Sequence, residues 1–249
     1  MGVANERSIA WGISQKLSEA GAELAFTYLG DALKKRVVPL AEKLNSNITF
    51  SCDVENKEDV IKLFKDIKLK WNEIDFVVHA VAFSDKSELS GEYLNTTREN
   101  FLKTLHISAY SLTEMVRMLS PKMNDGASIM ALTYYGSTRY MQSYNVMGVA
   151  KAALETSIKY LAVDMGDRGI RVNAISAGPM RTLAGAVINK SRKIYNYTIE
   201  NSPIKKPLSL EDIGKSSVYL MSDLSKGVTG EILYVDNGYN NVGMSVQEL

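Results

Sequence analysis

The hydrophobic positions of this chain follow two alternating periods. Short apolar runs predict buried strands at residues 23–28, 48–52, 76–79, 127–132, 171–177 and 232–235. Between these runs, apolar residues recur with helical spacing, as in Ile9, Ile13 and Leu17. Strands that alternate with amphipathic helices form βαβ units. The pattern therefore predicts an α/β fold: a single doubly wound Rossmann-type domain over residues 1–249, with a parallel sheet flanked by helices.

The start of the chain departs from this architecture. A doubly wound nucleotide-binding domain places its phosphate-binding turn directly after its first, central strand. Here the candidate turn begins at Gly2, so the first strand is expected to be missing. Strands on either side of the gap would keep unpaired backbone groups, which are costly when buried. We therefore expect the 249-residue chain to fold poorly.

The composition is typical of a globular protein and gives no sign of a nucleic-acid-binding or membrane protein. Hydrophobic residues make up 45% and charged residues 23% of the chain, as in ordinary globular proteins. The formal net charge of +1 gives no electrostatic case for a nucleic acid or an anionic membrane as partner. Cys52 is the single cysteine, so no intramolecular disulfide is possible, and a reducing, cytoplasmic location is expected. No apolar run approaches transmembrane length.

Tyr144 and Lys151 are the first candidates for chemistry. The helical pattern begins at about Tyr144, just after the strand predicted at 127–132. Residues seven apart project from one face of a helix, so the phenol and the ammonium are expected side by side. A cation strengthens the hydrogen bond that a phenol gives to a forming oxyanion. The alternative is that both side chains only cover a helix surface.

Candidate coenzyme contacts lie where predicted strands end, which is where open parallel sheets bind ligands. Backbone N–H groups near Ser8 and Ile9, at a helix N-terminus, could receive a pyrophosphate. Asp53 could accept a hydrogen bond from adenine or could cap the following helix. The segment Tyr28 to Asp31 has no base directly after its strand, which favours NADH over NADPH.

Three segments carry a family resemblance over essentially the whole chain. They are Gly-Val-Ala-x-x-x-Ser-Ile-Ala-x-Gly from Gly2, Tyr134 with Tyr144-Asn-Val-Met-Gly-Val-Ala-Lys151, and Arg171-Val-Asn-Ala-Ile-Ser-Ala-Gly-Pro-Met-Arg-Thr182. Together they resemble the NADH-dependent bacterial enoyl-(acyl-carrier-protein) reductases of the short-chain dehydrogenase/reductase superfamily. Ordinary members of that superfamily use Tyr-x3-Lys, which would place tyrosine where this chain has Met147.

The resemblance implies an oxidoreductase of fatty acid biosynthesis that reduces the trans-2 double bond of enoyl-acyl-carrier-protein thioesters with NADH. It implies a homotetramer and a mobile substrate-binding segment around residues 180–200. It implies Tyr134, Tyr144 and Lys151 as catalytic residues, and Ser84, Tyr134 and Tyr144 as substrate contacts. The implied cofactor contacts are Gly2, Ser8, Ile9, Asp53, Val54, Val81, Lys151, Met180, Arg181, Thr182, Leu183 and Ala184.

Two other functions compete with this one. An alcohol or ketoacyl reductase on the same fold is disfavoured by the Tyr144–Lys151 spacing. A nucleotide-sensing Rossmann protein that regulates a partner would have no need for that pair. No metal site is predicted, because neither His79 nor His106 has a second ligand at metal spacing.

Overall fold

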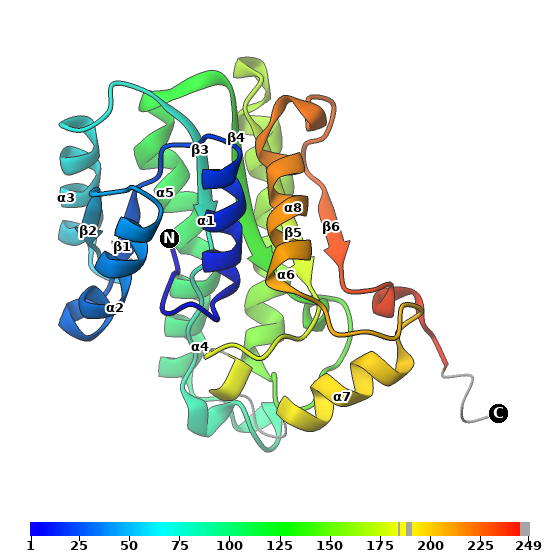
Figure 1. Cartoon of the computed structure of the whole chain (residues 1–249). Coiled ribbons are helices and arrows are strands. Elements are labelled where there is room, and N and C mark those ends of the chain that lie inside the picture. The colour runs from blue at the N-terminus through cyan, green and yellow to red at the C-terminus, as the bar shows by residue number, and fades with distance from the viewer. Residues whose placement is uncertain (184, 188–190, 245–249) are drawn as a thin grey trace.

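The computed structural model describes residues 1–183, 185–187 and 191–244, and its strands are all parallel. They form a pair with the order β1–β2 and a sheet with the order β3–β4–β5–β6 (Figure 1). The strands are β1 (Phe26–Tyr28), β2 (Thr49–Ser51), β3 (Ile74–His79), β4 (Met123–Thr133), β5 (Arg171–Ala177) and β6 (Ile232–Val235).

Helices cover both faces of the strands. The residues of α1 (Ile9–Glu19), α2 (Gly30–Lys43) and α8 (Leu210–Met221) share one hydrophobic cluster, in which α1 and α8 pack together. A second cluster takes in α3 (Lys57–Lys68), α5 (Ser111–Leu119) and α6 (Val146–Asp164). The remaining α-helices of the described residues are α4 (Arg98–Leu105) and α7 (Ser191–Asn201). The predicted layer architecture is confirmed.

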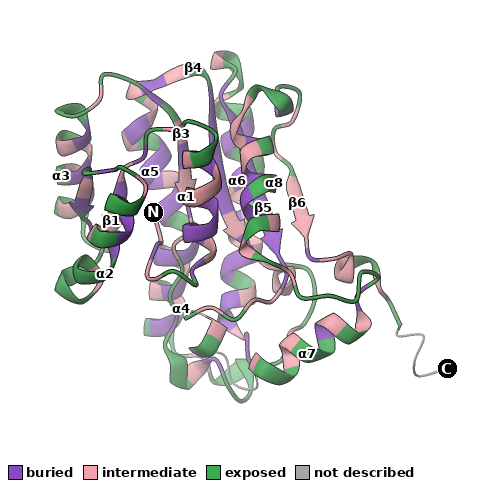
Figure 2. Cartoon of the chain, viewed as in Figure 1, coloured by how far each residue is buried: buried purple, intermediate pink, exposed green. Residues whose placement is uncertain are grey.

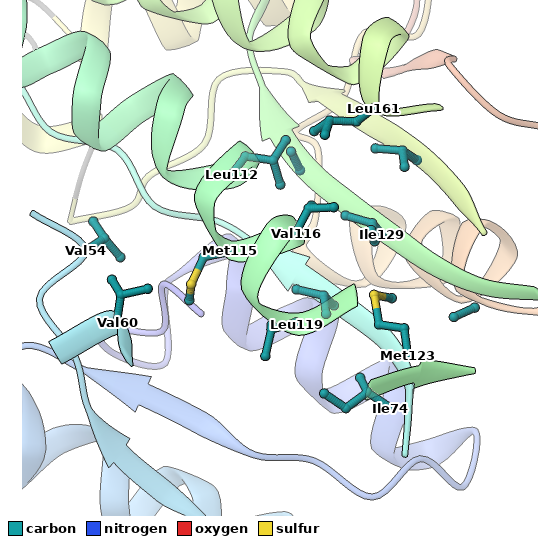
Figure 3. Packing of buried hydrophobic residues seen from close by; sticks show 14 of the residues in the cluster. Val54, Val60, Ile74, Leu112, Met115, Val116, Leu119, Met123, Ile129 and Leu161 are labelled. Carbon is teal, nitrogen blue, oxygen red and sulfur yellow. The ribbon is translucent and has the colours of Figure 1, made fainter. Parts of the chain in front are cut away.

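The central strands alternate between the two clusters. On β4, Ile129 belongs to the α3–α5–α6 cluster and Met130 to the α1–α8 cluster. On β5, Ala174 and Ile175 divide in the same way, because successive side chains of a strand point to opposite faces. Figure 3 shows the α3–α5–α6 cluster from close by, with Val116 of α5 and Ile129 of β4 among its labelled residues. Figure 2 shows that β4 and β5 are largely buried, that α2 is largely exposed, and that α3 and α7 mix exposed with partly buried positions.

Most predicted elements match the structure. The strands predicted at 171–177 and 232–235 have the predicted bounds, and Ser209 forms a capping box with Asp212 at the start of α8. The strand predicted at 23–28 forms only over Phe26–Tyr28. A π-helical segment (His106–Tyr110) separates α4 from α5. None of the described helices combines the length and apolar composition needed to cross a bilayer.

A slot separates the two groups of strands. It is a cavity of about 320 Å³, lined by residues of β1, β3, α1 and α3. Phe26 donates to the Ile48 carbonyl of the β2 side, so the backbone of Thr27, the next residue, faces the slot. Among the described residues, α1 is the first element, and the slot lies between β1 and β3.

The amino group of Met1 lies at one end of this slot. It donates to the carbonyl of Val78, which identifies Val78 as a slot-facing residue of β3. Burial lowers the pKa of this amino group to about 6, because the charged form loses its hydration. A peptide N–H would make the same contact without that cost.

Filling the slot should stabilise the fold. We expect an apolar, strand-forming extension of roughly ten residues ahead of Met1 to raise the free energy of unfolding by several kcal/mol, at about 1 kcal/mol per new hydrogen bond. Urea denaturation measures this change. The control extension carries proline at two central positions, since proline cannot donate to the ladder. Equal stability of the extended, control and 249-residue chains would contradict the prediction.

Candidate active site

The candidate residues lie at the carboxyl ends of β3, β4 and β5, toward the lower edge of the sheet in Figure 1. Tyr134 directly follows β4, and Lys151 lies in the second turn of α6. Residues 178–183 follow β5, while Gly2 packs against Ala80 just beyond β3. The topology thus brings the segments singled out in the sequence to one edge, as expected for a doubly wound sheet.

Tyr134 and Tyr144 form an edge-to-face aromatic pair. Their ring centroids are 5.0 Å apart, with an interplanar angle of 72°. Leu89 and Met147 share this cluster and help to bury the Tyr144 ring. Burial raises the pKa of both phenols, so each is held in its neutral, proton-donating form. A side chain at Gly136 would meet the Tyr144 ring at 2.5 Å, so only glycine leaves room for the ring there.

The predicted start of the helix at Tyr144 is wrong. Helix α6 begins at Val146, and Tyr144 lies on the turn before it. Asn145 has φ 38° and ψ −124°, which a continuing right-handed helix cannot contain. Tyr144 and Lys151 are therefore presented by a turn and a helix, and not by one helix face. Even so, Tyr144 contacts the first turn of α6, where its ring lies 3.7 Å from a Cβ built at Gly148.

Lys151 is a buried cation, with only 6% of its surface exposed. Its ammonium donates to the Leu132 carbonyl at 2.8 Å. Burial lowers its pKa to about 8, and the nearby Glu155 carboxylate opposes that shift. An ammonium has three N–H donors, so this backbone contact leaves two for a ligand. The alternative that Lys151 only covers a helix surface is excluded by its burial.

Glu155 was not identified from the sequence. It accepts a hydrogen bond from the Thr133 hydroxyl at 2.6 Å and lies one helical turn after Lys151. The spacing of opposite charges four residues apart was the available signal, because such residues are neighbours on a helix. Glu155 therefore links α6 to the end of β4 beside the buried ammonium.

The loop before α1 is shaped by Ser8. Its hydroxyl oxygen accepts hydrogen bonds from the amides of Ala4 and Asn5, both at 3.0 Å. The Ser8 amide donates to the Asn5 carbonyl, so it is used inside the loop and is not free to receive a phosphate as predicted. Ile9 opens the helix, whose first turn as described carries no acidic side chain. Its amide lies among the helix N–H groups that have no intrahelical partner.

The backbone conformation of Gly2 bears on whether a dinucleotide phosphate fits this loop. It adopts φ +99°, and a Cβ there would lie 2.1 Å from the Ala80 carbonyl oxygen. The chain therefore passes close to the end of β3 only because the residue is glycine. Together with the N-terminus of α1, this turn provides backbone N–H groups and a positive helix end, which suit an anionic group.

The structure locates the predicted adenine contacts Asp53, Val54 and Val81 and excludes the N-cap alternative for Asp53. Asp53 is not the N-cap of α3; Asn56 is, and its side chain accepts from Asp59. The Asp53 carboxylate instead accepts from the Glu55 amide. Val54 has its side chain in the core, so only its backbone is available to a ligand. Val81 is half-buried against the same core. The adenine role of these residues stays a prediction.

The segment after β5 was predicted to contact the nicotinamide end and to be mobile. Thr182 organises it: the hydroxyl accepts from Gly185, and the amide donates to the Met180 carbonyl. The guanidinium of Arg181 lies over the Tyr195 ring of α7, 4.7 Å from its centroid. Leu183 is exposed, and Ala184 lies outside the described residues. The proposed contacts of this segment and its mobility stay predictions.

Ser84 was predicted as a substrate contact, but its hydroxyl is already engaged. It is buried and exchanges hydrogen bonds with the side-chain amide of Asn100. Asn100 also accepts from the Asp85 amide, and sequence reasoning missed it because the two segments lie far apart along the chain. The substrate contact at Ser84 stays a prediction.

His79 is buried beside Ser111. Its Nε2 is 2.8 Å from the Ser111 hydroxyl, and burial lowers its pKa to about 3, so the ring is neutral. Within residues 1–183, 185–187 and 191–244, no three His, Cys, Asp or Glu side chains are grouped so as to hold a metal ion.

Comparisons with known sequences identify the family. A family profile described as Enoyl-(Acyl carrier protein) reductase matches residues 2–240. The chain is 57% identical over 244 residues to enoyl-(acyl-carrier-protein) reductase (NADH) 1 of Rhizobium meliloti, an alignment that covers 98% of this chain and 90% of the relative. It is 52% identical over 244 residues to the Rickettsia typhi enzyme FabI, covering 98% and 94% of the two chains.

Solved structures agree with these sequences. The crystal structure of FabI from Candidatus Liberibacter asiaticus matches with a TM-score of 0.96 and 54% identity, covering 98% of this chain and 95% of that one. The Anaplasma phagocytophilum enoyl-(acyl-carrier-protein) reductase, crystallised with NAD, matches with a TM-score of 0.94 and 52% identity, covering 98% and 93%.

The lowered pKa of Lys151 predicts pH-dependent dinucleotide binding. The ammonium is present below about pH 8 and is lost as the pH rises through that value. Losing one charge-assisted contact should weaken NADH binding roughly tenfold between about pH 7 and about pH 9. Fluorescence titration of NADH at several pH values measures the effect. In Lys151→Arg the guanidinium stays protonated, so a decline equal to that of the unmodified chain would refute the assignment.

Proposed function

Because the chain belongs to the enoyl-(acyl carrier protein) reductase family, we propose that it reduces the trans-2 double bond of enoyl-acyl-carrier-protein thioesters with NADH. The products are saturated acyl thioesters, which places the enzyme in fatty acid biosynthesis. The observation that carries the proposal is that the buried Tyr144 and Lys151 lie at the same sheet edge as Tyr134, which packs edge-on against Tyr144.

Residues of this edge suit NADH. The Gly2 turn and the Ile9 amide would receive the pyrophosphate, and the two remaining N–H groups of Lys151 would bind the nicotinamide ribose hydroxyls. When bound, NADH supplies the hydride that is added to the β-carbon of the enoyl thioester. The protein would stabilise the negative charge that develops on the thioester oxygen, and a proton drawn from solvent would then add to the α-carbon to complete the saturated thioester.

Tyr144 is the proposed donor to that oxygen. Its raised pKa keeps the phenol protonated, so it can donate a hydrogen bond as charge develops. A preorganised donor at such a position contributes about 3 kcal/mol, mainly in the transition state. The cationic Lys151 strengthens the same interaction. Tyr134, packed edge-on against Tyr144, would complete the acyl pocket.

Met147 argues against the ketone or alcohol reductase. That chemistry would need a tyrosine at this position, by the spacing of ordinary members of the superfamily. The structure instead packs the Met147 thioether in the same cluster as Tyr144 and Leu89. A thioether has no O–H to donate to an alkoxide.

A homotetramer in the cytoplasm is part of the proposal. Helices α4 and α6 and the π segment between α4 and α5 expose apolar side chains in one layer, which suits burial against other copies. These side chains are Leu102, Tyr110, Val149, Tyr160 and Val163. The free, buried thiol of Cys52 is consistent with a reducing compartment.

Two substitutions separate chemistry from coenzyme binding. We expect Tyr144→Phe to lower kcat about 100-fold with crotonyl-coenzyme A and to leave NADH affinity unchanged, because it removes only the donor. Lys151→Ala should lower kcat and also weaken NADH binding. Loss of NADH absorbance measures turnover, and acetoacetyl-coenzyme A serves as the ketone control. Unchanged turnover in both variants, or faster turnover of the ketone, would contradict the proposal.

Introducing a charged side chain into the exposed apolar layer tests the proposed tetramer. Val163 is 80% exposed in the single chain, so Val163→Glu should leave the fold intact and shift the tetramer to smaller species. Light scattering after size exclusion gives the mass. Leu69, which is 83% exposed beyond the end of α3, provides the matched control Leu69→Glu. A tetramer that survives Val163→Glu would count against this interface.

A further inference from the structure

The turn that carries Tyr144 is strained on both sides. Ser143 and Asn145 have φ values of 61° and 38°, in the region that favours glycine. The Met147 amide donates to the Tyr144 carbonyl at 3.0 Å, so residues 144–147 form a hydrogen-bonded turn. With ψ −124°, Asn145 occupies the first central position of a type II′ turn, where glycine is normally found. Such strain persists only where surrounding contacts enforce it.

The Asn145 side chain supplies those contacts. It is the N-cap residue of α6, yet its side chain makes no capping hydrogen bond. Its amide nitrogen instead donates to the Glu88 carbonyl at 3.0 Å and to the Gly91 carbonyl at 3.4 Å. Asparagine at an N-cap ordinarily accepts from the helix backbone, so this orientation serves the distant loop and not the helix.

The loop of residues 88–91, to which Asn145 donates its hydrogen bonds, is fixed by further contacts. The Glu88 carboxylate accepts from the amide and hydroxyl of Thr97 and from the side chain of the buried Asn100. Next to it, Leu89 packs against Tyr144 in the aromatic cluster. The loop therefore contacts the Tyr144 turn twice, through a side-chain amide on the polar side and through an apolar side chain on the other.

We propose that Asn145 is a positioning residue, which clasps the residue 88–91 loop and thereby holds the Tyr144 phenol at its reacting position. This proposal rests on the role proposed above for Tyr144. Without the clasp, the turn can relax from its strained conformation, and the Tyr144 ring shifts relative to Lys151. Catalytic hydrogen bonds lose much of their effect with small displacements, so turnover is the sensitive quantity.

Asn145→Gly separates positioning from stability. Glycine suits the φ of this turn, so the variant should melt no lower than the unmodified chain although it lacks the side-chain donor. We expect kcat with crotonyl-coenzyme A to fall about 10- to 100-fold, with the dissociation constant of NADH unchanged. Asn45, another asparagine with positive φ (56°), lies just after α2 and gives the matched control. Asn45→Gly should leave kcat unchanged.

A double variant shows whether Asn145 acts through Tyr144. If it does, Tyr144→Phe combined with Asn145→Gly should be no slower than Tyr144→Phe alone. Losses that multiply would overturn the proposal, as would an unchanged kcat in Asn145→Gly or a loss confined to NADH binding. If Tyr144→Phe alone leaves turnover unchanged, the role of Tyr144 fails and the clasp fails with it. A defect in Asn145→Gly beside a slow Tyr144→Phe supports both.

Discussion

The buried ammonium of Lys151 is the interaction on which the rest of the site depends. A charge inside a protein is tolerated only where hydrogen bonds replace its hydration. Here the Leu132 carbonyl at the end of β4 provides that contact, and Thr133 bonds Glu155 one turn further along α6. Two adjacent contacts thus set the position of α6 against β4. At the end of β4, Tyr134 packs edge-on against Tyr144, which lies on the turn before α6.

The turn before α6 contains residues whose backbone conformations are locally unfavourable. Ser143 and Asn145 hold backbone conformations that their residue types disfavour, and Gly136 must lack a side chain to admit the Tyr144 ring. Locally unfavourable choices concentrate at functional sites, where the surrounding structure compensates for them. In this chain the compensation comes from the loop around Glu88, which is anchored by Thr97 and Asn100.

The two halves of the sheet edge differ in how firmly they are supported. Tyr134 follows β4, which is paired on both sides with β3 and β5. The turn at Gly2, which is proposed to bind the coenzyme, instead lies beside the slot between β1 and β3, where Met1 contacts Val78. The proposed catalytic residue Tyr134 therefore depends on a continuous part of the sheet. The proposed phosphate site depends on the part where the sheet is divided.

Apolar periodicity determined the layered fold and the bounds of β5 and β6, because these features follow from residues close in sequence. The spacing of Tyr144 and Lys151, with its family resemblance, identified the pair but not its presentation. Only the tertiary structure decided that Tyr144 lies on a strained turn and that the Ser84 hydroxyl is hydrogen-bonded to the side chain of Asn100. Those facts rest on contacts between distant segments, such as Asn145 with Glu88, 57 residues apart. Such contacts leave no local pattern, because their partners meet only after the sheet has formed.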